Sequence, residues 1–426
     1  MIKIIRYGEV PEQEIFARVS EARDVSATVA EIISAVRRDG DEALYAYAEK
    51  FDGVKLDALE VPREEIDGAA ERVDAAFYAV LEKAARNIRE FHSRQLHDGF
   101  ELRREDGAIL GQRVMPLDRV GIYVPGGTAA YPSTVLMDCI PAKLAGCGEI
   151  IMVTPVKGEG KVAPEILAAA KLAGVDRIFK TGGAQAVAAL AYGTQSIPLV
   201  DKIVGPGNAF VAEAKRQVFG QVAIDMIAGP SEILVVADKT GNPRWIAADL
   251  LSQAEHDRLA SAVLVTDSEA LAQKVAEEIE VQLARLPRAE IARASIDTYG
   301  KIIVSDTLDA AIEIANELAP EHLELHLDDP FALLPKIRHA GSVFLGKHCP
   351  EALGDYLAGP NHTLPTMGTA HFSSPLSVDD FVKKSQYLYY SEEAFATVAQ
   401  DIACFAEKEG LSAHARSALV RWEDKT

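Results

Sequence analysis

The 426-residue sequence lacks several features that would place it in a particular class of protein. No stretch approaches the ~20 consecutive apolar residues that a membrane span needs, and residues 1–7 do not begin a signal peptide. Net positive charge is absent: the formal charge of −20 argues against binding nucleic acid or an anionic membrane. The four cysteines form no CxxC pair, which disfavours a disulfide framework. We therefore expect a soluble, cytoplasmic protein that acts on small molecules.

Alternating apolar strands and helical segments run through most of the chain. Helical patterning covers residues 25–50 and 62–95, and from residue 150 to residue 345 predicted strands alternate with helices. Such alternation is typical of parallel sheets with helices on both faces. We predict an α/β fold with two Rossmann-like, incompletely doubly wound parallel-sheet domains, a small N-terminal segment and a helical C-terminal tail.

Breaks in this pattern suggest domain boundaries, with the two sheets meeting near Gly229-Pro230-Ser231. The tail is too small to hold a core alone and should pack on the body or on another subunit. The predicted divisions are an N-terminal segment, 1–24; a first domain, 25–122 with 232–376; a second domain, 123–231; and the tail, 377–426.

Gln253 and His256 lie three residues apart at the end of a predicted helix, and this spacing places both side chains on one face. An imidazole beside an amide oxygen is a plausible pair of zinc ligands. The alternative is a histidine that merely favours the helix dipole. Asp355, in the Gly- and Pro-rich segment 349–375, could supply a further oxygen ligand.

Three glycine turns follow predicted strands directly, at residues 123–127, 181–185 and 205–208. In open α/β sheets, such turns expose backbone N–H groups and helix N-termini to a ligand crevice. They are compatible with a phosphate or dinucleotide site, although none is a complete GxGxxG. The alternative is tight turns that need positive φ.

The sequence has two pairs of a carboxylate and an imidazole that could act as acid and base catalysts. Within each pair, the reference pKa values of the carboxyl group and the imidazole differ by about two units. Glu321 and His322 are adjacent at the junction between a predicted helix and a predicted strand, and Glu409 and His414 lie in the tail. Taken alone, each pair is better explained as a solvated helix end.

Nine motifs, in order between Val120 and His414, together resemble the histidinol dehydrogenase family: GIYVPGG, GGAQA, GPGNAF, AGPSE, LLSQAEHD, APEHLE, EALGDY, GPNHTLPT and EGLSAH. The resemblance implies a homodimer with shared active sites, one zinc ion per subunit and NAD as cofactor. It also implies two successive oxidations, from L-histidinol through the aldehyde to L-histidine. Metal and catalytic residues would then lie in the first domain and NAD contacts in the second, with the tail crossing to the partner.

The resemblance also implies a role for each residue of the site. His322 would be the general base, and Glu321 would activate the water that hydrates the aldehyde. Zinc would be bound by Gln253, His256, Asp355 and, from the partner subunit, His414. The substrate would be bound by these four residues and by Glu321, Ser231, His362 and the partner's Glu409. NAD would be bound by Tyr123, Gln185 and Asn208.

Two other functions remain open. A relative of the same fold could oxidise another primary alcohol, such as a sulfonated diol, although an acidic Glu409 suits a cationic amino alcohol better. A binding protein that keeps the fold and the metal without catalysis would not need Glu321 or His322.

Overall fold

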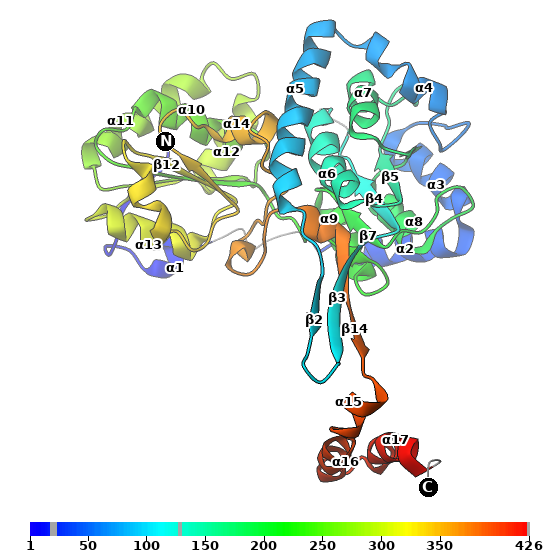
Figure 1. Ribbon diagram of the computed structural model, residues 1–426. Helices are drawn as coiled ribbons and strands as arrows, with labels where there is room; N and C mark the ends of the chain where they lie inside the picture. Colours follow the sequence, from blue (N-terminus) through cyan, green and yellow to red (C-terminus); the bar gives the residue numbers. More distant parts are fainter. Residues whose placement is uncertain (18–23, 127–129, 424–426) are drawn as a thin grey trace. The chain divides into compact units, whose positions relative to one another are not determined.

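The computed structural model describes residues 1–17, 24–126 and 130–423 and divides into two compact units (Figure 1). The first unit comprises Met1–Gln95 and Leu117–Phe381 and contains two parallel sheets. The second comprises Leu96–Pro116 and Val382–Thr426. The predicted α/β class with two parallel sheets is confirmed.

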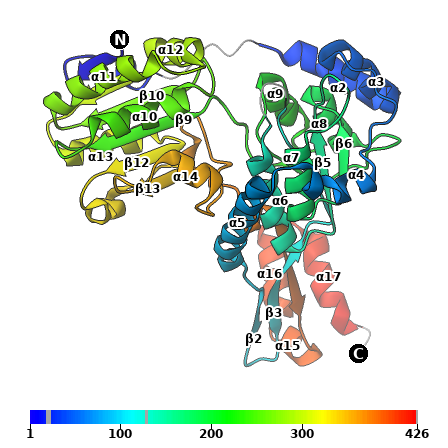
Figure 2. The ribbon, with the colours of Figure 1, turned by 90° about the horizontal axis from the view of Figure 1, so that it is seen from above.

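Sheet A of the first unit has six strands, all parallel, in the order β1-β11-β10-β9-β12-β13. Helices cover both faces (Figure 2). Because side chains alternate along a strand, Ile233 and Val235 of β9 enter one core, while Leu234 and Val236 enter the other. The strands are β1 (Lys3–Arg6), β9 (Glu232–Ala237), β10 (Ser261–Thr266), β11 (Lys301–Val304), β12 (His322–His326) and β13 (Ser342–Leu345). The helices of this part are α1 (Glu12–Ile15), α10 (Pro243–Ala254), α11 (Glu269–Leu283), α12 (Ala289–Thr298), α13 (Leu308–Leu318) and α14 (Glu351–Tyr356).

Sheet B of the same unit has five parallel strands in the order β6-β5-β4-β7-β8. The strands are β4 (Arg119–Tyr123), β5 (Glu149–Thr154), β6 (Arg177–Lys180), β7 (Lys202–Val204) and β8 (Ala223–Ile224). The helices are α2 (Ser26–Asp39), α3 (Asp41–Tyr47), α4 (Arg63–Asp67), α5 (Ala75–His92), α6 (Pro132–Ala145), α7 (Pro164–Ala173), α8 (Gly183–Tyr192) and α9 (Ala209–Val218).

The packing of the N-terminal helices differs from the predicted division. Residues 25–122 were expected to join 232–376, but Val29, Ile32 and Leu44 belong to the hydrophobic core of sheet B. β4 is a central strand of that sheet, and β1, from the predicted N-terminal segment, pairs with β11 of sheet A. An apolar helix face predicts burial but does not identify the sheet that buries it.

The second unit combines two separate chain segments. β2 (Phe100–Arg103) and β14 (Val382–Tyr389) lie on either side of β3 (Ile109–Pro116) in an antiparallel sheet, followed by α15 (Glu392–Ala396), α16 (Ala399–Lys408) and α17 (Ser412–Glu423). Ala403, Ala406 and Ala415 form a small core between the last two helices. The tail from residue 377, predicted as mostly helical, therefore contains an eight-residue strand. Within the described residues, no helix is long and apolar enough to cross a membrane.

Candidate active site

Three elements of the first unit carry the candidate metal and catalytic residues. Gln253 lies in the last turn of α10, His322 is the first residue of β12, and Asp355 lies in α14. The Gly- and Pro-rich segment 349–375 thus contains a short helix. The candidate catalytic pair, Glu321 and His322, stands at the amino end of its strand, whereas the glycine turns follow the carboxyl ends of strands in sheet B.

Gln253 provides the strongest indication of a missing ligand. Its side chain is fully buried, yet neither amide atom has a hydrogen-bond partner among the described residues. Leaving such a group unpaired costs about 1–3 kcal/mol, so a buried amide normally has a partner. An amide oxygen is also an acceptable ligand for a divalent metal, and the orphaned group therefore fits the predicted zinc site.

His256 lies just beyond the end of α10. Its backbone N–H donates to the Gln253 carbonyl at 3.1 Å in a tight turn, and its side chain is exposed. His256 is therefore not part of the helix, and a common face with Gln253 stays a prediction. Burial, with a smaller electrostatic contribution from His256, lowers the pKa of His362 to about 4. The two imidazoles are therefore close enough to interact.

His322 is buried, and its two ring nitrogens have different surroundings. Nδ1 lies 3.0 Å from the carbonyl oxygen of Glu232 and 3.6 Å from Oε2 of Glu321. Because a carbonyl only accepts, Nδ1 carries the hydrogen of that bond and Nε2 keeps its lone pair. Nε2 lacks a hydrogen-bond partner within the described part of the chain and lies 3.9 Å from Oδ1 of Asp355. Burial lowers the pKa of His322, which favours a neutral imidazole with a free base at Nε2.

Glu321 is held beside this imidazole. Its Oε2 accepts the backbone N–H of Glu232 at 2.9 Å, and the Ser231 hydroxyl also hydrogen-bonds to the carboxyl group. Burial raises the pKa of Glu321 well above its ordinary value, more than these hydrogen bonds lower it. A buried carboxylate of this kind is a stronger base than an exposed one.

Glu351 was not among the predicted site residues, yet it joins the cluster. One ligand atom from each of His322, Glu351 and Asp355 lies within 4.8 Å of the others. The Ser252 hydroxyl donates to Oε2 of Glu351 at 3.1 Å, which connects α14 with the helix that carries Gln253. Burial raises the pKa of Glu351 to about 7. The four-residue spacing of Glu351 and Asp355 on one helix face was the sequence signal for this residue.

His362 is anchored on both sides. Its Nδ1 lies 3.1 Å from the carbonyl oxygen of Asp355. Asn361 donates to the Met137 carbonyl at 2.7 Å, and the Thr363 hydroxyl donates to Asp138 at 2.8 Å, so both neighbours bind α6. The predicted residues Ser231, Glu321, His322, Asp355 and His362 therefore come together around one buried region.

The three predicted NAD residues lie at the carboxyl ends of strands of sheet B. The Tyr123 hydroxyl accepts the N–H of Gly183 at 3.0 Å, and burial raises the pKa of Tyr123 to about 12. Asn208 caps α9 by accepting the N–H of Phe210 at 3.0 Å, and Gln185 is buried in α8. These contacts also shape the turns themselves: Gly183 and Gly205 adopt positive φ.

Three of the predicted residues, Gly127, Glu409 and His414, lie outside the described part of the first unit. Gly127, in the first glycine turn, lies outside the described residues. Glu409 and His414 belong to the second unit, where Glu409 ends α16, His414 lies in the first turn of α17, and both side chains are exposed.

A parallel α/β fold with glycine turns after its strands, and with a neutral imidazole, buried carboxylates and an unpaired buried amide among its described residues, is compatible with an oxidoreductase active site. A family model described as histidinol dehydrogenase matches residues 17–422. The chain belongs to this family, and it is a dehydrogenase.

Individual relatives agree with this assignment. The chain is 57% identical over 423 residues to histidinol dehydrogenase of Syntrophotalea carbinolica, covering 99% of this chain and 96% of the relative. It is 54% identical over 428 residues to the enzyme of Clostridium acetobutylicum, covering 99% of each. The crystal structure of histidinol dehydrogenase from Elizabethkingia anophelis is similar with a TM-score of 0.94 and 38% identity, covering 99% of this chain and 98% of that one.

Proposed function

We propose that the chain oxidises L-histidinol through L-histidinal to L-histidine in histidine biosynthesis, in two successive NAD-linked steps supported by zinc. The observation that carries the proposal is the fully buried Gln253 amide, which is unpaired among the described residues. The preceding residue, Ser252, hydrogen-bonds to Glu351, which lies in one cluster with His322 and Asp355. The named relatives act on histidinol, which supports this substrate over other primary alcohols.

In the alcohol oxidation, His322 takes the hydroxyl proton at Nε2 as hydride leaves the carbon. Its hydrogen bond to the Glu232 carbonyl fixes the required tautomer. Burial keeps the imidazole neutral before the reaction, and the nearby Glu351 carboxyl favours the imidazolium once the proton has arrived. General-base catalysis of this kind contributes roughly 10²- to 10⁴-fold.

In the aldehyde oxidation, a water must add to the carbonyl carbon before a second hydride can leave. Glu321 removes a proton from that water, because its buried carboxylate is more basic than usual. The proton that His322 took in the first oxidation passes to the carbonyl oxygen as the hydrate forms. The neutral imidazole can then take a hydroxyl proton of the hydrate as the second hydride leaves. The hydrogen bonds from Ser231 and from the backbone of Glu232 hold the Glu321 carboxyl in place for this step.

Gln253, His256 and Asp355 would hold one zinc ion per subunit, with His414 of the partner subunit as the fourth protein ligand. When bound, zinc acts as a Lewis acid that anchors and orients the substrate. The donor set of two imidazoles, an amide oxygen and a carboxylate oxygen suits a borderline metal. Ser231, His362 and the partner's Glu409 would bind the substrate's polar groups.

NAD accepts the hydride in each of the two oxidations when it is bound. Tyr123, Gln185 and Asn208 would line its site, since all three lie at the strand ends where α/β sheets bind nucleotides. The proposed enzyme is a homodimer with shared active sites. We also propose a cytoplasmic location, which four free cysteines among the described residues support.

The decisive experiment measures NADH formation from L-histidinol and the zinc content of the same sample, before and after chelation. We expect two NADH per histidinol, near one zinc per subunit, and loss of activity on chelation that added zinc restores. No turnover of histidinol in the zinc-loaded protein would refute the proposal, and turnover of a sulfonated diol instead would establish the alternative alcohol dehydrogenase.

The His322→Asn variant separates catalysis from metal binding alone. We expect alcohol oxidation to fall by about 10²-fold or more, because the base is lost, while the zinc content stays near that of the parent protein. Unchanged oxidation in this variant would refute the role of His322 as the base. A parent protein that binds zinc but oxidises no alcohol would instead be a binding protein that only keeps the fold.

A further inference from the structure

Each of the three elements that carry the candidate site has a further carboxyl group. Residues four apart on a helix or two apart on a strand share a face, so each of these groups lies on the same face of its element as a candidate site residue. The pairs are Asp249 with Gln253 on α10, Glu324 with His322 on β12, and Glu351 with Asp355 on α14. None of the roles in the proposed reaction uses Asp249 or Glu324.

Glu324 supplies a hydrogen bond that α14 cannot make for itself. This helix has only six residues, and its N-cap residue, Pro350, provides no side-chain acceptor. The first N–H groups of a helix need acceptors from outside, and a helix this short is unstable alone. Oε1 of the buried Glu324 accepts the N–H of Glu351, the first residue of α14, at 2.7 Å. Glu324, a residue of β12, thus takes the place of an N-cap side chain for α14.

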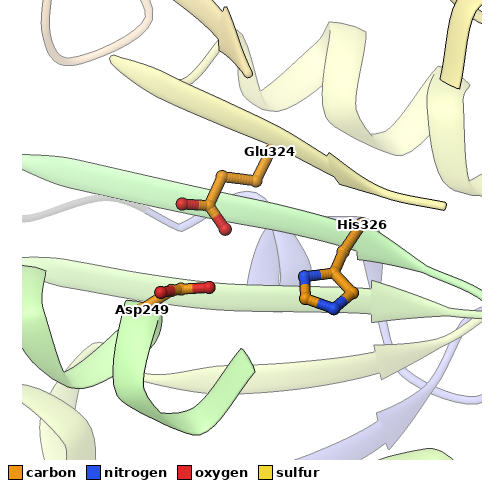
Figure 3. A group of neighbouring side chains, drawn as sticks. All are labelled: Asp249, Glu324 and His326. Atoms are coloured by element: carbon orange, nitrogen blue, oxygen red, sulfur yellow. The ribbon is translucent and has the colours of Figure 1, made fainter. Parts of the chain in front are cut away.

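Asp249 completes this arrangement from α10. Figure 3 shows the Asp249 and Glu324 carboxyl groups facing one another, with His326 beside them, and the two carboxyls form a hydrogen bond. Two carboxylates cannot bond in this way unless they share a proton. Burial accordingly raises the pKa of Asp249 to about 6 and that of Glu324 well above its usual range.

We propose that Glu324 is a positioning residue: with its carboxyl group facing Asp249, it caps α14 and so fixes Asp355 relative to His322. The bond to Glu351 holds the start of the helix, and Asp355 lies one turn further along. The role assigned to Asp355 rests on the proposed function, but the hydrogen bonds do not. His322 and Glu324 lie on one strand, so the cap ties the metal side of the site to the catalytic side.

The test compares Glu324→Gln with Glu324→Leu. In glutamine, the amide oxygen can accept the Glu351 N–H while the amide NH₂ donates to Asp249, which reproduces both bonds without the shared proton. Leucine has a similar volume but can make neither bond. Leu325→Val is the matched control, because Leu325 is the next residue of the strand and its buried side chain enters the core of sheet A.

Two quantities are measured for each variant: the zinc dissociation constant, by competition with a chromophoric chelator, and kcat and KM for histidinol. We expect Glu324→Leu to weaken zinc binding and to lower kcat/KM by about 10- to 100-fold, the usual effect of losing a residue that orients a ligand. Glu324→Gln should stay close to the parent protein. Leu325→Val should lower the melting temperature without changing zinc affinity.

Parent-like zinc binding in Glu324→Leu would overturn the proposal, and so would a Glu324→Gln variant as impaired as the leucine variant. A second equivalent of zinc in the parent, lost in both variants, would make Asp249, Glu324 and His326 a metal site in place of a cap. If the parent protein binds zinc but does not oxidise histidinol, the proposed function fails, while the zinc measurements still decide the role of Glu324.

Discussion

The substitution Asp138→Asn tests how a buried carboxyl group sets the pH dependence of stability. Asp138, in α6, is fully buried, and its Oδ1 accepts the Thr363 hydroxyl at 2.8 Å. Oδ2 has no hydrogen-bond partner among residues 1–17, 24–126 and 130–423. Burial raises the pKa of Asp138 from 3.8 to about 8. The carboxyl is therefore neutral in the folded protein at pH 7.

The sign of the effect follows from this shift. Between pH 4 and pH 8 the folded protein binds one more proton at this position than the unfolded chain, so stability falls as pH rises. Each pH unit in that window changes the free energy of unfolding by about 1.4 kcal/mol, or roughly 6 kcal/mol over the whole window. Asparagine does not titrate, and its amide oxygen can still accept the Thr363 hydroxyl. The variant should therefore gain stability relative to the parent as pH rises.

Urea unfolding at pH 5, 6.5 and 8 measures this difference, at one protein concentration and with chelator present. The curves of parent and variant should diverge progressively towards pH 8. Asp57→Asn is the control, because it removes a carboxylate from an exposed position. A constant difference between Asp138→Asn and the parent from pH 5 to pH 8 would show that the carboxyl is not held neutral, and the reasoning from burial would be refuted.

Three further predictions concern the site and its support. Glu321→Gln should slow oxidation of the aldehyde more than oxidation of the alcohol, measured by supplying each substrate separately. Equal losses would contradict the proposal that Glu321 removes a proton from the water that hydrates the aldehyde. Mixing subunits that carry His256→Ala with subunits that carry His414→Ala should restore some activity, because a dimer of the two variants keeps one intact shared site. No recovery after proven subunit exchange would show that His414 acts in the site of its own chain. Lys215→Met should destabilise the protein by about 3–5 kcal/mol in urea unfolding, because it leaves the buried Asp225 without its ion-pair partner; a loss below about 1 kcal/mol would contradict this.

Local sequence signals predicted much of the fold. From β5 to β13, most strands alternate with helices as the apolar periodicity between residues 150 and 345 predicts. Short polar caps such as Asn208 and Thr307 mark where such helices begin. By contrast, α6 was not predicted, because Pro132 and Pro141 suggest breaks and the helix is apolar on nearly every side.

The site was predictable in a different sense. The motifs identified Glu321 and His322, and the structure brings them together with Asp355 and His362. Periodicity alone could not do so, since contacts between residues far apart in sequence depend on tertiary packing. Glu324 was missed for the same reason: in the sequence it is one more strand residue, and its importance depends on the 2.7 Å bond to Glu351.

The sheet of the second unit has a consequence for protein synthesis. β3 is its central strand, but its second partner, β14, begins more than 260 residues later. At about 5–20 residues per second, the ribosome needs roughly 15–50 s to supply that strand. During this interval, one edge of β3 has unpaired N–H and C=O groups open to other nascent chains. Ribosome-bound intermediates that end before residue 382 should therefore be the species of this protein most dependent on chaperones.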